Sequence, residues 1–111
     1  MKTIKILVVA LVATLFTVHV NAQAKTETIK VSGNCEMCKA RIEKAAKVSG
    51  VSKAEWSDKT GLLTLVYDPA KVKSDDVQKK IAAVGHDTEK FKADDKTYKS
   101  LPGCCQYERK K

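Results

Sequence analysis

Two cysteines separated by two residues carry the clearest chemical signal in this sequence. Cys35 and Cys38 fall where a short strand gives way to a helix, so both sulfur atoms can converge on one point beside the helix N-terminus. Free backbone amides and the positive dipole end of a helix stabilise thiolates there. Two thiolates suit a soft cation of low coordination number, copper(I) above all, because structural zinc usually takes four ligands. The pair therefore predicts binding and transfer of a soft heavy-metal ion.

A second pair of cysteines follows Pro102-Gly103. A disulfide between the adjacent Cys104 and Cys105 would strain the peptide that joins them. The alternatives are a disulfide, thiolates added to the first site, a separate soft-metal site, and a bridge between two chains, as in a metal-bridged dimer. Both cysteines are therefore further candidate metal ligands.

The first cysteine pair also permits two functions that need no metal. A thiol-disulfide oxidoreductase is the alternative function, and an inert small disulfide is the other. A redox enzyme of thioredoxin type would be expected to show a Trp-Cys-x-x-Cys run and a later proline loop, and neither pattern is present. Metal binding without enzymatic activity is the prediction.

Hydrophobic periodicity predicts the elements that must position these cysteines. Alternating residues predict strands over 27–32, 51–58 and 62–68, and a short last strand over 87–92. Apolar residues three and four apart predict one helix from Cys38 to Gly50 and another from Ser74, as N-cap, to Gly85. The order predicts an α+β, ferredoxin-like βαββαβ fold, with a four-stranded antiparallel sheet and two helices on one face. The expected core residues are Ile42, Trp56, Leu63, Leu65, Tyr67 and Ile81.

Several short motifs between residues 27 and 91 add to the cysteine pair. They are Val31-Ser32-Gly33-Asn34-Cys35-Glu36-Met37-Cys38-Lys39-Ala40-Arg41-Ile42-Glu43-Lys44-Ala45, Gly50-Val51, Thr60-Gly61, Tyr67-Asp68-Pro69 and Ala83-Val84-Gly85-His86-Asp87. In these motifs the sequence resembles the heavy-metal-associated (HMA) domain family. The resemblance implies that Cys35 and Cys38 bind copper(I), or mercury(II) or another soft metal as in a mercury-binding periplasmic protein. It also implies metal exchange with a metal-donor or metal-acceptor protein.

The resemblance to the family raises a question about two further residues, Met37 and His86. Family members usually carry a methionine two residues before the first cysteine; here that methionine is absent, and Met37 lies inside the motif, pointing either inward or to solvent. The Gly85-His86 turn would lie beside the thiols. An imidazole there would supply a third metal ligand or a proton-dependent gate, because its charge changes near neutral pH. The alternative for His86 is an exposed loop residue.

The N-terminal segment has the layout of a secretory signal peptide. Lys2 and Lys5 precede an apolar run of 13 residues, from Ile6 to Val18, which is shorter than the roughly 20 residues that span a bilayer. The predicted division is a signal peptide at 1–22, a heavy-metal-associated domain at 25–92 and a polar C-terminal tail with the Cys-Cys pair at 93–111. We therefore expect a periplasmic or secreted protein, without stable membrane insertion after signal removal, in surroundings where disulfides can form.

Size and charge limit the partners. The 111 residues carry a net charge of +8, and loss of residues 1–22 removes two lysines and no acidic residue, which leaves +6. So short a chain excludes a large enzyme, and its composition excludes low-complexity and collagen-like classes. Basic residues on the first helix would steer a partner with an acidic docking face.

Nucleic acid is not expected, because the first and third strands lack the outward aromatic residues on which RNA-recognition modules stack bases.

Overall fold

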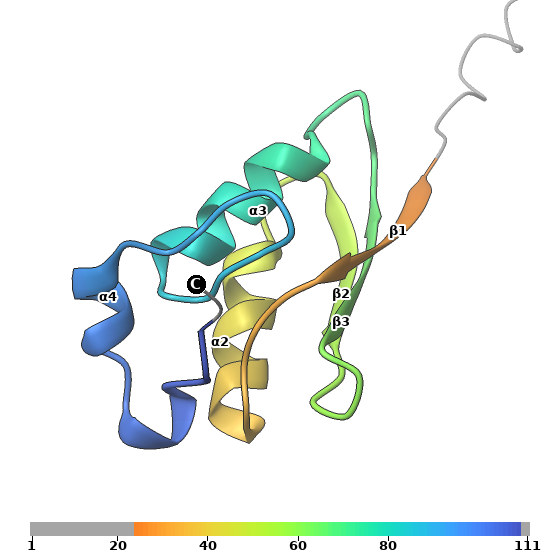
Figure 1. Ribbon diagram of the computed structural model, residues 1–111. Helices are drawn as coiled ribbons and strands as arrows, with labels where there is room; N and C mark the ends of the chain where they lie inside the picture. Colours follow the sequence, from red (N-terminus) through yellow and green to blue (C-terminus); the bar gives the residue numbers. More distant parts are fainter. Residues whose placement is uncertain (1–23, 110–111) are drawn as a thin grey trace, which may run out of the picture.

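The computed structural model describes residues 24–109, so the predicted signal peptide at 1–22 lies outside the described residues. Within this range, β1 (Lys25–Lys30), β2 (Val51–Trp56) and β3 (Leu62–Tyr67) form an antiparallel sheet in the order β1-β3-β2. Two helices, α2 (Glu36–Ala46) and α3 (Ser74–Ala83), cover one face of this sheet (Figure 1). The predicted α+β, ferredoxin-like fold is confirmed.

The predicted fourth strand at 87–92 is reduced to one isolated bridge in the described part of the chain. Val31 pairs with Thr88, and beyond that bridge the amide of Thr88 donates to the carbonyl oxygen of Phe91. This bond turns the chain back on itself, so it cannot continue beside β1. The backbone amide of Lys30 instead donates to the side-chain carboxylate of Glu89, at 3.0 Å. The sheet of residues 24–109 therefore has three strands rather than four.

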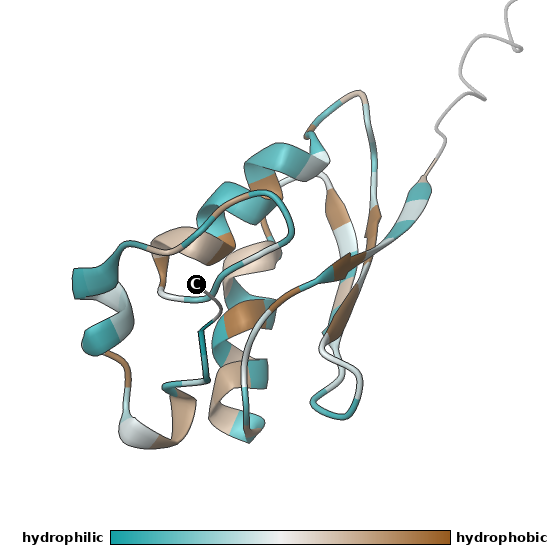
Figure 2. Cartoon of the chain, viewed as in Figure 1, coloured by the Kyte–Doolittle hydropathy of each residue, from teal (hydrophilic) through white to brown (hydrophobic). Residues whose placement is uncertain are grey.

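The core lies between the sheet and the two helices. All six predicted core residues are buried, and Ile42, Leu63, Leu65 and Ile81 have no exposed surface. Trp56 is also fixed by a hydrogen bond from its Nε1 to the carbonyl oxygen of Val31, at 3.0 Å. Figure 2 shows hydrophobic stretches on the strands and along α2. Among residues 24–109, no helix has the length and apolar content to cross a bilayer.

The helix boundaries differ from those predicted. Helix α2 begins at Glu36 and ends at Ala46, before Gly50, which has a φ of +98° and leads the chain into β2. Ser74 is the first residue of α3 rather than its N-cap; Lys73 holds that position and makes no side-chain capping bond. The carbonyl oxygen of Lys73 nevertheless accepts the bonds of the first helical turn, so α3 can begin without a capping side chain.

Residues 93–109, called here the C-terminal segment, pack against the domain. They contain a short helix, α4 (Asp95–Lys99), and one turn of 3-10 helix, η2 (Gly103–Cys105). Although most of the segment is polar, its buried residues are Ala93, Leu101, Cys105 and Tyr107. Figure 1 shows the chain returning after α4 to the N-terminal end of α2, where η2 and α2 are in contact.

Candidate metal centre

The first turn of α2 positions the first two thiols. Cys35 precedes the helix in extended backbone (φ −136°, ψ −177°), and its carbonyl oxygen accepts a hydrogen bond from the amide of Lys39. Cys38 lies on the core side of the helix and is fully buried, whereas Cys35 is partly exposed. Their Sγ atoms are 3.6 Å apart. The two thiols therefore meet at one end of α2, with one of them reachable from solvent.

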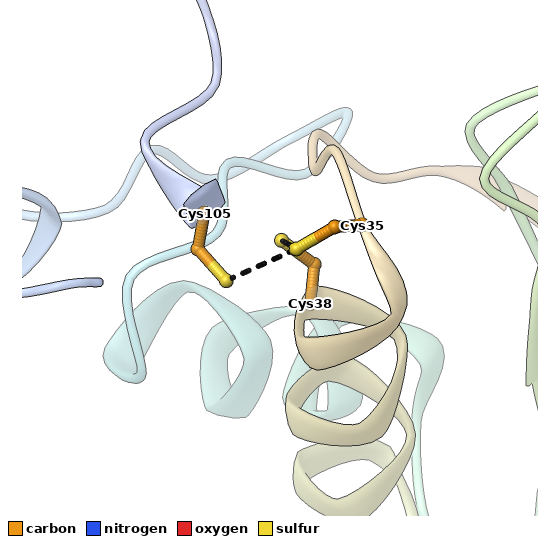
Figure 3. Close-up of side chains that lie close together, drawn as sticks. All are labelled: Cys35, Cys38 and Cys105. Atoms are coloured by element: carbon orange, nitrogen blue, oxygen red, sulfur yellow. Dashed lines mark hydrogen bonds between the residues drawn. The ribbon is translucent and has the colours of Figure 1, made fainter. Parts of the chain in front are cut away.

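The turn of η2 brings Cys105 to the same place (Figure 3), and Cys104 lies beside it. From Cys35 Sγ, the Sγ atom of Cys105 lies at 3.7 Å and that of Cys104 at 3.4 Å. The sulfur atoms of Cys35, Cys38 and Cys105 all lie within 4.8 Å of one another, and all four cysteines carry free thiols. Of the alternatives open for Cys104 and Cys105, this geometry fits addition to the first site.

The spacing of the sulfur atoms suits a metal ion. Metal–sulfur bonds of about 2.3 Å separate tetrahedral ligand sulfurs by roughly 3.8 Å and trigonal ones by roughly 4.0 Å. The separations given above for Cys35 are 3.4 to 3.7 Å, and Cys104 and Cys105 are 3.9 Å apart. Small shifts of side chains would therefore let the sulfur atoms of Cys35, Cys38 and Cys105 surround one soft ion.

The thiols differ in how readily they ionise. A hydrogen bond from the backbone amide of Cys38, followed by one with the Cys104 thiol, lowers the pKa of Cys35 to about 7. Burial acts in the opposite direction on Cys38 and raises its pKa to about 11. Burial also raises the pKa of Cys105. The expectation that the helix end stabilises both thiolates of the motif is thus met by Cys35 alone, because Cys38 lies in the core.

Arg41 is a site residue that sequence analysis missed. Its Nη1 lies 3.4 Å from Cys105 Sγ, so a guanidinium charge faces a buried sulfur. The helical spacing of Cys38 and Arg41 was a usable signal, since residues three apart share a helix face. The charge of Arg41 favours the thiolate of Cys105, which metal binding requires.

The sequence predicted that basic residues of the first helix would attract an acidic partner, but Lys39 is already paired within the protein. It forms an ion pair with Glu43 at 2.5 Å and donates to the carbonyl oxygen of Trp56. Its charge is therefore balanced by a neighbouring carboxylate. Lys44 on α2 and Lys47, its C-cap residue, are by contrast exposed.

His86 is fully buried, so its alternative as an exposed loop residue is wrong. Its Nδ1 lies 2.8 Å from the carbonyl oxygen of Ser32, and its ring stacks on Tyr107 with centroids 5.6 Å apart. The Nε2 atom is buried without a hydrogen-bond partner among the described residues. His86 is not one of the three residues whose ligand atoms converge.

Met37 points to solvent rather than inward. Its side chain is 52% exposed, and its Sδ atom lies 3.6 Å from Cys104 Sγ. The sequence left both orientations open, because residues at the first turn of a helix can face either way. Cys104 reaches Met37 because the C-terminal segment folds back onto α2, which the local sequence around Met37 does not show.

Comparison with known proteins agrees with this fold. No protein-family profile matches the chain. It is 39% identical over 64 residues to a zinc-transporting ATPase of Synechocystis sp., a match that spans 56% of this chain and only 9% of the ATPase. The solved structure of the CopZ metallochaperone is 29% identical, with a TM-score of 0.56, and the match covers 58% of this chain and 98% of that one.

Two further solved structures are similar. Oxidized MerP from Ralstonia metallidurans CH34 is 30% identical with a TM-score of 0.57, and the match covers 60% of this chain and 96% of MerP. A ZiaAN sub mutant is 37% identical with a TM-score of 0.52, over 60% of this chain and 96% of that one. The fold and the cysteine cluster define a small metal-binding module rather than an enzyme. The chain belongs to the heavy-metal-associated domain family.

Proposed function

We propose that this protein binds one copper(I) ion through Cys35, Cys38 and Cys105 and passes it to a partner protein. The observation that carries the proposal is the convergence of three sulfur atoms within 4.8 Å, from segments 70 residues apart. Thiolates select soft ions. The third thiol comes from the C-terminal segment, whose two cysteines the sequence kept as further candidate ligands beside Cys35 and Cys38.

Copper(I) fits this donor set better than zinc. Structural zinc sites usually have four ligands, whereas three sulfurs form the converging group here. Similar solved structures include a copper-binding domain of the P-type ATPase HMA7, 30% identical with a TM-score of 0.55. Mercury(II), which also prefers sulfur, is the alternative ion.

Transfer would use the exposed side of the cluster. Cys38 and Cys105 are buried, but Cys35 is partly exposed and Cys104 is exposed. A thiolate or thioether of the partner can therefore bond to the ion while one of the original sulfur bonds breaks. The ion stays in the same oxidation state throughout, so the transfer needs no oxidant or reductant.

The partner and the compartment follow from charge and from the N-terminal segment. Exposed Lys44 on α2 and Lys47 at its C-cap would attract a metal donor or acceptor with an acidic docking face. The signal-like residues 1–22 would direct the protein to the periplasm or outside the cell. Metal loading would then protect the thiols from oxidation in that compartment.

The test is anaerobic competition between the reduced protein and a copper(I) chelator whose absorbance changes on binding. Cys35→Ser should abolish binding at the chelator concentrations that the wild type withstands. Loss of one of three thiolates in Cys105→Ser should weaken affinity by at least about tenfold, which is about 1.4 kcal/mol. Lys71→Ser, at the opposite end of α2 beside Gly50, is the matched control and should bind as the wild type does.

Parallel titrations with zinc and mercury(II) identify the ion. Tighter binding of zinc than of copper(I) would contradict the choice of metal. Wild-type binding in Cys105→Ser would contradict the three-sulfur site. Turnover of a dithiol substrate by the metal-free protein would instead indicate a thiol-disulfide oxidoreductase.

A further inference from the structure

Three sulfur atoms gather on the solvent side of the cluster, next to the buried group. Cys104 Sγ lies between two others, at 3.4 Å from Cys35 Sγ and 3.6 Å from Met37 Sδ. Cys104 is exposed, Met37 is 52% exposed and Cys35 is partly exposed. The inner thiols of Cys38 and Cys105 are both fully buried. The sulfurs thus form an outer and an inner set, which share Cys35.

We propose that Cys104, Cys35 and Met37 form an outer binding station for a monovalent soft cation, from which the ion moves to the inner thiols. The proposal rests on the function proposed above and assigns a path to the same ion. A thioether is uncharged and selects copper(I)-like ions. It is a weaker ligand than a thiolate, which suits a station that must release the ion inward or to a partner.

The movement is an exchange of ligands without change of oxidation state. The bonds of the ion to Cys104 Sγ and Met37 Sδ break, and bonds to Cys38 Sγ and Cys105 Sγ form. The bond to Cys35 Sγ persists, so the ion is never released to water. Cys38 and Cys105 lose their thiol protons to solvent as they bind, and the freed Cys104 thiolate takes one up.

The surroundings of Met37 keep the outer station accessible. Met37 lines an open groove of 650 Å³ along α2, together with Ala40, Arg41, Lys44, Ala45 and Val84. Part of this lining is apolar, and Arg41 also contacts Cys105. A partner that approaches over this groove meets the thioether of Met37 before it meets the buried thiols.

The test uses reduced protein labelled with ¹³C-methyl methionine, whose methyl signals are followed by NMR. Silver(I), which replaces copper(I) because it is stable to oxidation, is added in steps. The sequence contains Met1 and Met37, so the Met37 signal is assigned by its loss in Met37→Leu. We expect this signal to shift as silver binds. Leu62→Met, which adds a thioether on the exposed side of β3, is the control, and its new methyl signal should not shift.

A kinetic measurement tests the path itself. In stopped-flow transfer of copper(I) from a chelator, Met37→Leu and Cys104→Ser should each slow uptake by about tenfold, which corresponds to about 1.4 kcal/mol in the barrier to uptake. Both side chains are exposed, so neither change should unfold the protein. Because the inner thiols remain, equilibrium affinity should change less than the uptake rate.

The two proposals fail in different ways. The outer station is overturned if wild-type protein binds silver(I) with no shift of the Met37 methyl signal and Met37→Leu takes up copper at the wild-type rate. In that case the inner metal site is still supported. If wild-type protein binds neither ion, the proposed function itself fails.

Discussion

His86 occupies a site in which only its neutral form is well accommodated. Its Nδ1 lies within hydrogen-bond distance of the carbonyl oxygen of Ser32, and its buried Nε2 has no partner among residues 24–109. A proton on Nε2 would place an unpaired N–H group and a positive charge in the interior. Burial accordingly lowers the pKa of His86.

This burial predicts sensitivity to acid. Since the pKa of His86 is lower in the folded protein than in the unfolded chain, its contribution to stability is present above about pH 6.5 and is lost as the pH falls toward the folded value. Urea unfolding of the metal-free, reduced protein between pH 7.5 and 5 should show a declining free energy of unfolding. His86→Gln should show a flatter dependence, and equal slopes for the two proteins would contradict this role.

Cys35 titrates at higher pH and overlaps only the upper part of that measurement. Its pKa is lowered to about 7 from a model-peptide range near 9, so its contribution is present above pH 9 and is lost as the pH falls through about 7. Below pH 6.5 the thiol is already largely protonated. The decline below that pH therefore reports mainly on His86.

At the scale of elements, the C-terminal segment is held by specific contacts. The hydroxyl of Tyr107 donates to the carbonyl oxygen of Gly85 at 2.7 Å and accepts from the amide of Asp87 at 2.9 Å. Arg109 pairs with Asp87 and with Asp95, each at 2.9 Å. These bonds fix the segment on both sides of the turn after α3. They keep η2, and therefore Cys105, beside the first turn of α2.

Gly85 tests the link between this packing and the metal site. It has a φ of +110°, and a Cβ atom there would lie 2.9 Å from Leu101 Cδ2. Gly85→Ala should cost about 1–3 kcal/mol of stability through backbone strain, and by displacing Leu101 it should also weaken copper(I) binding as Cys105→Ser does. Chemical denaturation and chelator competition measure the two effects.

Gly50→Ala is the matched control for Gly85→Ala. Gly50 has a φ of +98°, and its Cβ would meet Lys71 and Val72 rather than the C-terminal segment. It should lose similar stability but keep wild-type metal affinity. Equal affinities in the two variants would show that the packing of Leu101 does not position Cys105.

At the scale of the whole molecule, one ion would connect two ends of the described chain. Cys35 and Cys38 follow the first strand, whereas Cys104 and Cys105 lie in η2. A ligand that binds only the folded state stabilises it by about 2.7 kcal/mol at 100 times its dissociation constant. Because the ligands come from two segments, that stabilisation should extend to both of them.

Hydrogen exchange can measure this extension. On addition of one equivalent of copper(I), amides of the C-terminal segment should exchange more slowly, together with those of the first turn of α2. In Cys104→Ser/Cys105→Ser, copper(I) should protect α2 alone. Protection confined to α2 in the wild type would mean that the C-terminal segment does not take part in binding.

The sequence predicted features that depend on local pattern. Periodicity placed the core residues Trp56 and Leu65 correctly, and the Cys35–Cys38 spacing identified two thiols that do converge. It failed at 87–92, where the backbone bond between Thr88 and Phe91 turns the chain away from the sheet. The C-terminal segment is mostly polar, so its composition gave no sign of packing. Its few buried residues also show no regular period. The sequence therefore left the place of Cys105 open among several alternatives.

The separation of Cys35 and Cys105 along the chain has a consequence for biosynthesis. Both thiols of the first pair leave the ribosome before Cys105 is translated, since Cys105 lies 70 positions after Cys35 in the sequence. Before that point a nascent polypeptide can offer only two of the three thiols of the converging group, those of Cys35 and Cys38. If the ion is copper(I) as proposed, we expect its tight retention to begin only after translation has passed η2 and that turn has docked beside α2.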